Sequence, residues 1–175
     1  MPTFREIYEA DMARYGEAGA NAYIRRLLRY LRKTQTAADP LTRNIYRVLY
    51  KRQCEKHGIE IPWTTSIGKG LYLGHAYNIT VNPAAKIGSN CNLHKGVVIG
   101  QTNRGSKKGA PVIGNRVWIG VNAAVVGAVT IGDDVLIAPN AYVNCDIPPH
   151  SVVYGNPCVV KAETNATLSY IENTI

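Results

Sequence analysis

The chain has 175 residues and a formal net charge of +8, and 46% of its residues are hydrophobic while 18% are charged. This length and composition fit a folded domain with a buried core and exclude wholesale disorder. No apolar run reaches the roughly 18 residues of a membrane span, and the N-terminus lacks the basic and apolar regions of a signal peptide. We therefore expect a cytoplasmic protein with no transmembrane segment.

Four cysteines are scattered along the chain, namely Cys54, Cys91, Cys145 and Cys158. No Cys-x-x-Cys pair occurs among them, so the sequence indicates neither a zinc knuckle nor a redox motif. We expect reduced thiols and no bound metal.

Residues 4–56 have the pattern of a helical segment. Apolar side chains recur at helical spacing between Ala20 and Leu31, the Asp39-Pro40 step breaks the pattern, and a further helix follows. Gly58 suits the left-handed position that closes a helix. We assign residues 1–58 to this N-terminal helical segment.

Arginine and lysine are concentrated in residues 25–33 of the helical segment. The plainest interpretation is the solvated face of an amphipathic helix. Attraction of a phosphate-bearing cofactor, an anionic substrate or a membrane surface is the alternative, which leaves peripheral membrane contact open. No recognised reader motif accompanies the charge, so we expect no nucleic-acid partner.

After Gly58 the apolar period changes to six. Glycine often follows the leading aliphatic residue of a hexad, and the residue two places before a leader is often small or apolar. The leaders are Ile61, Ile67, Leu73 and Ile79, then Ile87, Leu93 and Ile99, and finally Ile113, Ile119, Val125, Ile131, Ile137 and Val143. A period of six matches neither a helix nor an alternating strand. It indicates a parallel β-helix whose leaders fill the axis of the coil.

Residues 101–110 interrupt the hexads with a polar, basic, glycine-containing stretch. Because the segments on either side stay in phase, we predict that the solenoid expels this stretch as a protruding loop. A tolerated insertion is one interpretation. A loop that closes over a substrate is the favoured one, since such loops commonly carry function.

The hexads, the expelled loop and the ending at residues 146–157 resemble the hexapeptide-repeat acetyltransferases. The resemblance is good from about Glu60 to Lys161. Residues 70–76, Gly-Leu-Tyr-Leu-Gly-His-Ala, are closest to the serine acetyltransferase branch. Residues 100–105 are similar to small members of that branch associated with surface-polysaccharide synthesis.

This resemblance implies a mainly β fold, a left-handed parallel β-helix with an N-terminal helical segment. The β-helix domain would span residues 59–162, with the protruding loop at 101–110 and a C-terminal tail at 163–175. Acetyl-CoA is the implied co-substrate, no metal is required, and the expected assembly is a homotrimer.

The resemblance also places the catalytic histidine at His75 and its orienting carboxylate at Glu60, fifteen residues earlier. A hydroxyl is a poor nucleophile at neutral pH and needs a nearby base. Imidazole supplies that base, and a carboxylate on its other nitrogen fixes the tautomer. Positions fifteen apart can lie close together on adjacent coils. A polar corner residue is the alternative for His75, and a surface acid is the alternative for Glu60.

The remaining site residues also follow from the resemblance. CoA is expected along the coils, against the small residues and the end of the domain: Gly120, Ala123, Ala138, Pro157 and Lys161. Packing alone is the alternative for the three small residues. Acceptor-binding candidates come from the prefix, the first coil and the loop: Asp11, Asn78, Asn82, Gln101 and Arg104.

The departures from the serine enzymes concern the acceptor. Those enzymes have an Asp directly before the catalytic histidine, where this chain has Gly74. Pro83 and the Gly109-Ala110 pair replace further charged side chains. We therefore interpret the chain as an acetyl-CoA-dependent O-acetyltransferase acting on a sugar hydroxyl of a surface-polysaccharide precursor. Serine O-acetylation in cysteine biosynthesis is the first alternative.

Two non-transferase interpretations remain. A carbonic-anhydrase-like β-helix would need three histidines converging on zinc, and the spacing of His57, His75, His94 and His150 supplies no close pair. We expect His94 to be a corner or surface side chain. A non-catalytic scaffold or sugar-binding β-helix would have the same repeats, but it would not need the spacing between Glu60 and His75.

Overall fold

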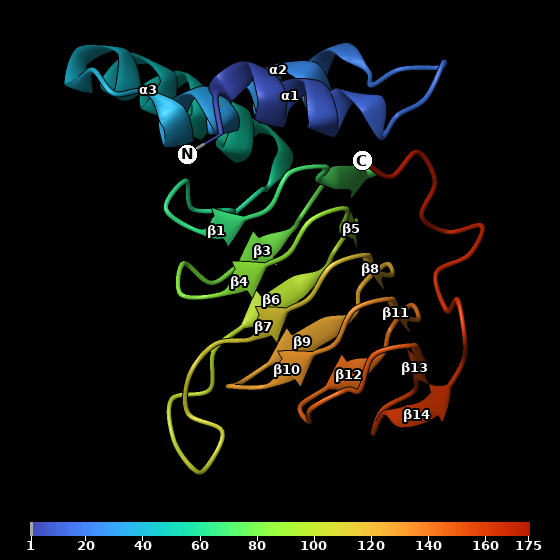
Figure 1. Ribbon diagram of the computed structural model, residues 1–175. Helices are drawn as coiled ribbons and strands as arrows, with labels where there is room; N and C mark the ends of the chain where they lie inside the picture. Colours follow the sequence, from blue (N-terminus) through green and yellow to red (C-terminus); the bar gives the residue numbers. More distant parts are fainter. Residues whose placement is uncertain (1) are drawn as a thin grey trace.

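The computed structural model describes residues 2–175 and places helices across one end of a solenoid of short strands (Figure 1). Within these residues the chain forms three helices, α1 (Phe4–Ala13), α2 (Ala22–Thr36) and α3 (Pro40–His57). None of them is long and apolar enough to cross a membrane. The helical prefix is confirmed, with one more break than the apolar pattern indicated. Gly16 and Gly19, both at positive φ, separate α1 from α2.

Local signals fix the helix ends. Asn21 and Asp39 cap α2 and α3 by accepting hydrogen bonds from backbone N–H groups of the first turn. Gly58 closes α3 in the left-handed conformation, at φ 62°, as its position in the sequence predicted. The chain therefore enters the solenoid directly from α3.

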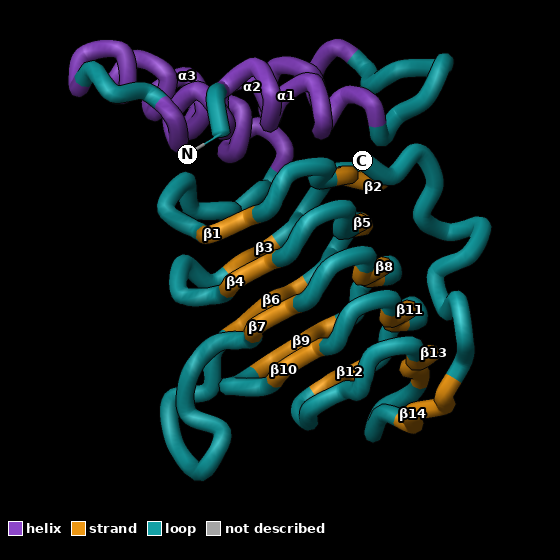
Figure 2. The backbone as a smooth tube through the Cα atoms, viewed as in Figure 1, coloured by secondary structure: helices purple, strands orange, loops and turns teal. Residues whose placement is uncertain are grey.

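The strands stack into three sheets along the solenoid (Figure 2). Within the described chain, the sheet orders are β1-β4-β7-β10, β14-β13-β11-β8-β5-β2 and β12-β9-β6-β3. Every strand pair is parallel except β13 with β14. The bounds are β1 (Ser66–Ile67), β2 (Tyr72–Gly74), β3 (Thr80–Val81), β4 (Lys86–Ile87), β5 (Asn92–His94), β6 (Val98–Gly100), β7 (Val112–Ile113), β8 (Val117–Ile119), β9 (Ala124–Val126), β10 (Thr130–Ile131), β11 (Val135–Ile137), β12 (Tyr142–Val143), β13 (Ser151–Tyr154) and β14 (Val159–Ala162).

The register of the sheets stacks hexad leaders on hexad leaders. Ile67 pairs with Ile87, and Ile87 pairs with Ile113. The leaders and the small residues two places before them are almost all buried in the axis of the solenoid. One predicted leader is misplaced, because Val81 rather than Ile79 stands opposite Ile99. Ile79 and Val81 are both aliphatic and both buried. The sequence pattern alone therefore could not show which of them leads the hexad.

The helices cover the backbone of the first coil. A first coil has no preceding strands, so several of its carbonyl groups lack sheet partners. Arg32 Nη2 donates to the carbonyl of Gly68 at 2.7 Å, and Arg14 Nη1 donates to that of Gly70 at 2.7 Å. The Tyr50 hydroxyl donates to the Ile61 carbonyl at 2.7 Å. The prefix is therefore the cap of the solenoid.

Residues 101–110 form a loop that extends from the solenoid (Figure 1). The base of the loop is closed by two backbone hydrogen bonds of 2.9 Å between Thr102 and Gly109. Lys107 is tied to Asp146 by an ion pair of 2.8 Å. At the tip, a Cβ built on Gly105 would meet no atom within 4 Å.

Residues 163–175 run back along the solenoid toward the helices (Figure 1). The buried carboxylate of Asp134 accepts from the Thr167 hydroxyl at 2.6 Å and from His150 at 2.8 Å. Near the end of the tail, the Asn92 amide donates to the Tyr170 carbonyl at 3.2 Å. The tail is therefore packed onto the β-helix rather than free.

Candidate active site

His75 lies on an enlarged corner of the solenoid. Gly74 stands opposite His94, and Thr80 stands opposite Val98, so the five residues 75–79 face the three residues 95–97 of the next coil. The two-residue offset of the hexads is located here. His75 adopts φ 49°, and its side chain is exposed. The imidazole therefore lies outside the wall of the solenoid, at the enlarged corner.

Glu60 lies on the same side of the first coil. Its backbone bridges to Thr80 of β3, the strand into which the His75 corner leads. Its N–H donates to the Ile79 carbonyl at 2.8 Å, and its side chain is exposed. Within residues 2–175 no hydrogen bond joins Glu60 to His75. The pairing of these two side chains stays a prediction.

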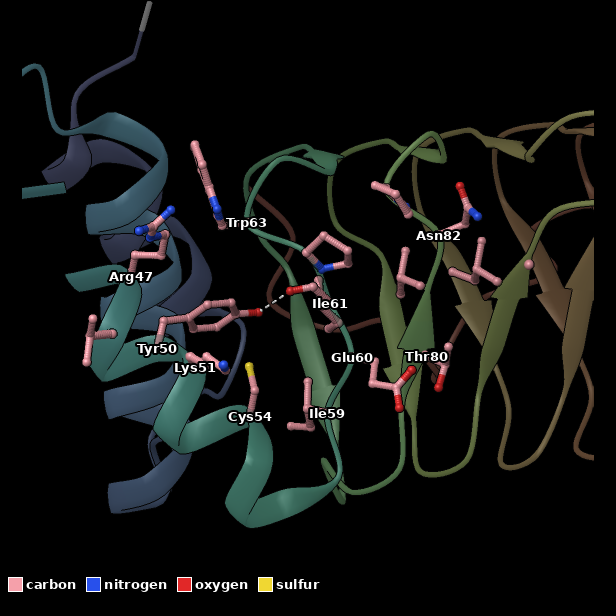
Figure 3. Close-up of a pocket in the computed structure, with 16 residues that line it drawn as sticks. Arg47, Tyr50, Lys51, Cys54, Ile59, Glu60, Ile61, Trp63, Thr80 and Asn82 are labelled. Atoms are coloured by element: carbon pink, nitrogen blue, oxygen red, sulfur yellow. Dashed lines mark hydrogen bonds between the residues drawn. The ribbon is translucent and has the colours of Figure 1, made fainter. Parts of the chain in front are cut away.

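A groove of about 860 Å³ separates α3 from the sheet of β3 and β6 (Figure 3). Glu60, Thr80 and Asn82 line it from the solenoid side, and Tyr50 and Cys54 line it from α3. Arg47, Lys51 and Trp63 also line it. The groove has apolar walls with charged and amide groups, which is the usual chemistry of a small-molecule site.

His94 is a feature that the sequence interpretation missed. Its ring lies 4.6 Å from that of Trp118, and within the described chain its buried Nε2 has no hydrogen-bond partner. Burial, with a smaller contribution from the charge of His75, lowers the pKa of His94 to about 4. A Cβ built on Gly74 would collide with the His94 ring. His94 is therefore a neutral packed ring, and the signal for it in the sequence was Gly74, at the equivalent place in the preceding coil.

The predicted CoA residues differ in exposure. Gly120 and Ala138 directly follow β8 and β11, which places them at the His75 corner of later coils. Pro157 is exposed on the turn between β13 and β14, and Lys161 is exposed in β14 with Glu163 as its ion-pair partner at 2.9 Å. Ala123 is fully buried, so only its backbone can reach a co-substrate.

Asp11 is not available to an acceptor, which corrects our interpretation of it. Its side chain is 0% exposed. Arg32 Nε donates to Asp11 Oδ2 at 2.7 Å, and the Leu71 N–H donates to Asp11 Oδ1 at 2.9 Å. Burial raises the pKa of Asp11, and the charge of Arg32 opposes this shift. The residue joins α1, α2 and the first coil.

The other acceptor candidates lie at the surface in two groups. Asn78 is exposed on the His75 corner at φ 53°, and Asn82 lines the groove. Gln101 directly follows Gly100, which also lines the groove, and Arg104 lies exposed near the loop tip. Asn78 and Asn82 are therefore the candidates nearest to His75 along the chain.

No group of three or more histidine, cysteine, aspartate or glutamate side chains within the described chain is arranged to hold a metal ion.

The fold and the repeats define the class of protein to which this chain is similar. The chain is a left-handed parallel β-helix built from hexapeptide repeats, and residues 110–145 match the family described as "Bacterial transferase hexapeptide (six repeats)".

Curated proteins that are similar in sequence to part of this chain include serine acetyltransferases. A serine acetyltransferase of Helicobacter pylori is 38% identical over 99 residues, which are 57% of this chain and 58% of that protein. A serine acetyltransferase of Mycobacterium tuberculosis is 34% identical over 100 residues, which are 57% of this chain and 44% of the relative. The chain thus matches less than two thirds of the length of these relatives.

Solved structures agree over most of the chain. Soybean serine acetyltransferase, as the apoenzyme, is similar at a TM-score of 0.77 and 26% identity, covering 92% of this chain and 70% of that one. Serine acetyltransferase of Neisseria gonorrhoeae in complex with serine is similar at a TM-score of 0.71 and 28% identity, covering 91% and 69%. The helical prefix is therefore included in the structural likeness.

Proposed function

We propose that this chain transfers an acetyl group from acetyl-CoA to a hydroxyl acceptor, with His75 as the general base. The observation that carries the proposal is the exposed His75 on the enlarged corner of a hexapeptide β-helix. The relatives named serine acetyltransferase support it.

In this reaction the imidazole of His75 accepts the hydroxyl proton while the acceptor oxygen attacks the thioester carbonyl carbon. The carbon–sulfur bond then breaks, and the imidazolium returns the proton to the CoA thiolate, so that the products are the O-acetyl ester and CoA. Glu60 acts as the positioning residue that favours the imidazolium. Gly120 and Ala138 lie at the same corner in later coils, along which we expect the co-substrate to bind.

L-serine is the acceptor that the relatives favour, since they are named for it. A specific observation keeps a neutral sugar of a surface-polysaccharide precursor as the second candidate. The His94 ring occupies the space that a side chain at position 74 would need, and Asp11 is held by Arg32. The chain therefore lacks a free carboxylate at two places where a serine ammonium would need one.

The test compares two left-handed corner histidines. His75→Asn and His150→Asn both keep a residue that tolerates positive φ, because asparagine does so readily, and both positions have this conformation at φ 49° and 57°. His75→Asn should lower CoA release about 10²–10⁴-fold, while His150→Asn should leave it within about threefold. Equal activity of the two variants would remove His75 from the mechanism. Glu60→Gln should show a smaller loss than His75→Asn.

The acceptor is tested with the wild-type protein, L-serine and a panel of sugars and nucleotide-sugars. A kcat/KM for serine above about 10⁴ M⁻¹s⁻¹ lies in the range of an enzyme's own substrate and would eliminate the sugar. A homotrimer is also part of the proposal, and light scattering on the purified protein tests it.

A further inference from the structure

Two cysteines meet at the end of the solenoid that β13 and β14 form. Cys145 follows β12 and Cys158 precedes β14, thirteen positions later in the chain. Their Sγ atoms are 3.7 Å apart. Both side chains are half-buried, whereas Cys54 and Cys91 are buried elsewhere. The pair therefore combines proximity with access.

The surroundings link this pair to two parts of the proposed site. Cys158 directly follows Pro157, on the turn where CoA is expected to end. Cys145 directly precedes Asp146, whose Oδ2 holds Lys107 of the protruding loop at 2.8 Å and whose Oδ1 accepts from the Thr130 N–H at 2.8 Å. A covalent bond here would join the turn after β13 to the segment that anchors the loop.

We infer that Cys145 and Cys158 are a redox-modification site that forms a reversible disulfide within one chain. A disulfide has an S–S distance of about 2.0 Å, so the two sulfur atoms must approach further by side-chain rotation and a small movement of the turn. The exposed turn after β13 has no later coil stacked on it and can make this adjustment. The inference is independent of the acetyl-transfer proposal.

The chemistry requires an oxidant, and a small-molecule disulfide such as oxidised glutathione is sufficient. One cysteine, as the thiolate, attacks a sulfur of the oxidant and releases one glutathione thiolate, which is protonated. The second cysteine then attacks the mixed disulfide and releases the second glutathione. The protein loses two hydrogen atoms, and one glutathione disulfide becomes two thiols, so electrons and protons balance.

The rate of the reaction should depend on pH. Burial, the neighbouring Cys158 thiol and the charge of Asp146 raise the pKa of Cys145, and the charge of Lys107 opposes that shift. A raised pKa lowers the thiolate fraction at neutral pH, and the thiolate is the nucleophile. The experiment is therefore run at mildly alkaline pH.

The full chain is incubated with glutathione buffers of increasing oxidised fraction, quenched with acid and analysed by intact mass and by peptide mapping without reduction. The expected wild-type product is a single chain, not covalently linked to another, whose mass is about 2 Da lower. Its peptide map should show Cys145 linked to Cys158, with Cys54 and Cys91 as free thiols. Cys145→Ser and Cys158→Ser should each stop at a glutathione adduct on the remaining cysteine.

Several results would overturn the inference. These are a wild-type mass that does not change, a stable glutathione adduct without the internal link, a link that includes Cys54 or Cys91, or a link between two chains. The wild-type peptide map decides the question even if a serine variant folds poorly. Melting curves of the reduced variants show whether they fold.

Discussion

Replacing Asp11 with alanine tests whether this carboxylate is structural. The side chains of Asp11 and Arg32 are 0% and 1% exposed, and their closest contact is 2.7 Å. Removing one partner of a buried ion pair leaves the other charge unpaired away from water, at a cost of about 3–5 kcal/mol. Asp11→Ala also removes the acceptor of the Leu71 N–H, which costs about 1–3 kcal/mol when the group stays buried.

These two costs involve the same carboxylate and are not additive, so the loss expected for Asp11→Ala is at least about 3 kcal/mol. A domain of this kind is stable by about 5–15 kcal/mol, and the change would therefore be large. Urea unfolding followed by circular dichroism measures it. Glu9→Ala is the matched control on α1, because Glu9 is 61% exposed in its ion pair with Arg5. Such a pair contributes less than about 1 kcal/mol.

The two roles of Asp11 give opposite results. If the carboxylate is structural, Asp11→Ala lowers the urea midpoint. The KM for the acceptor then stays unchanged in the fraction of the variant that remains folded. If Asp11→Ala unfolds at the wild-type midpoint while the acceptor KM rises tenfold or more, the reasoning from burial is refuted. Asp11 would then have to be an acceptor-binding residue.

Three further outcomes are expected. Because the pKa of His94 is about 4 when folded and 6.5 when exposed, the unfolded chain binds more protons between these values. Acidification from pH 6.5 to 4 should therefore lower the free energy of unfolding. His94→Gln should flatten this dependence, and equal urea–pH profiles would contradict the assignment. Gly74→Ala should lower the free energy of unfolding by about 1–3 kcal/mol through overpacking against His94, as measured by thermal melting. In a background with His94→Ala, most of this destabilisation by Gly74→Ala should disappear. Lys107→Ala should change stability by less than about 1 kcal/mol but accelerate hydrogen exchange across residues 101–110, so unchanged exchange would show that the loop is not anchored there.

The six-residue period predicted the architecture because every coil of a solenoid repeats the same local packing arrangement. Each leader occupies the axis and stacks on the leader of the next coil, as Ile67 does on Ile87. The pattern did not locate the two-residue offset correctly, since Ile79 and Val81 are both aliphatic and both buried. The pairing of Thr80 with Val98 was needed to decide between them.

The six-residue period could not predict side-chain contacts between different elements. The partner of Asp11 is Arg32, on a different helix, and an acidic side chain near the start of a chain gives no sign of burial. Cys145 and Cys158 approach because β13 and β14 turn back at the end of the solenoid. Sequence spacing described them as unrelated thiols.

The cap formed by the helices also determines how the solenoid ends. A stack of parallel strands has the same open edge at each terminal coil, and such an edge can pair with another copy of itself without limit. At one end Arg14, Arg32 and Tyr50 donate to the carbonyl groups that a further coil would use. At the other end β14 turns antiparallel onto β13 and interrupts the repeat. At both ends, some of the groups that an added coil would need are therefore already paired, which disfavours end-to-end growth of the solenoid.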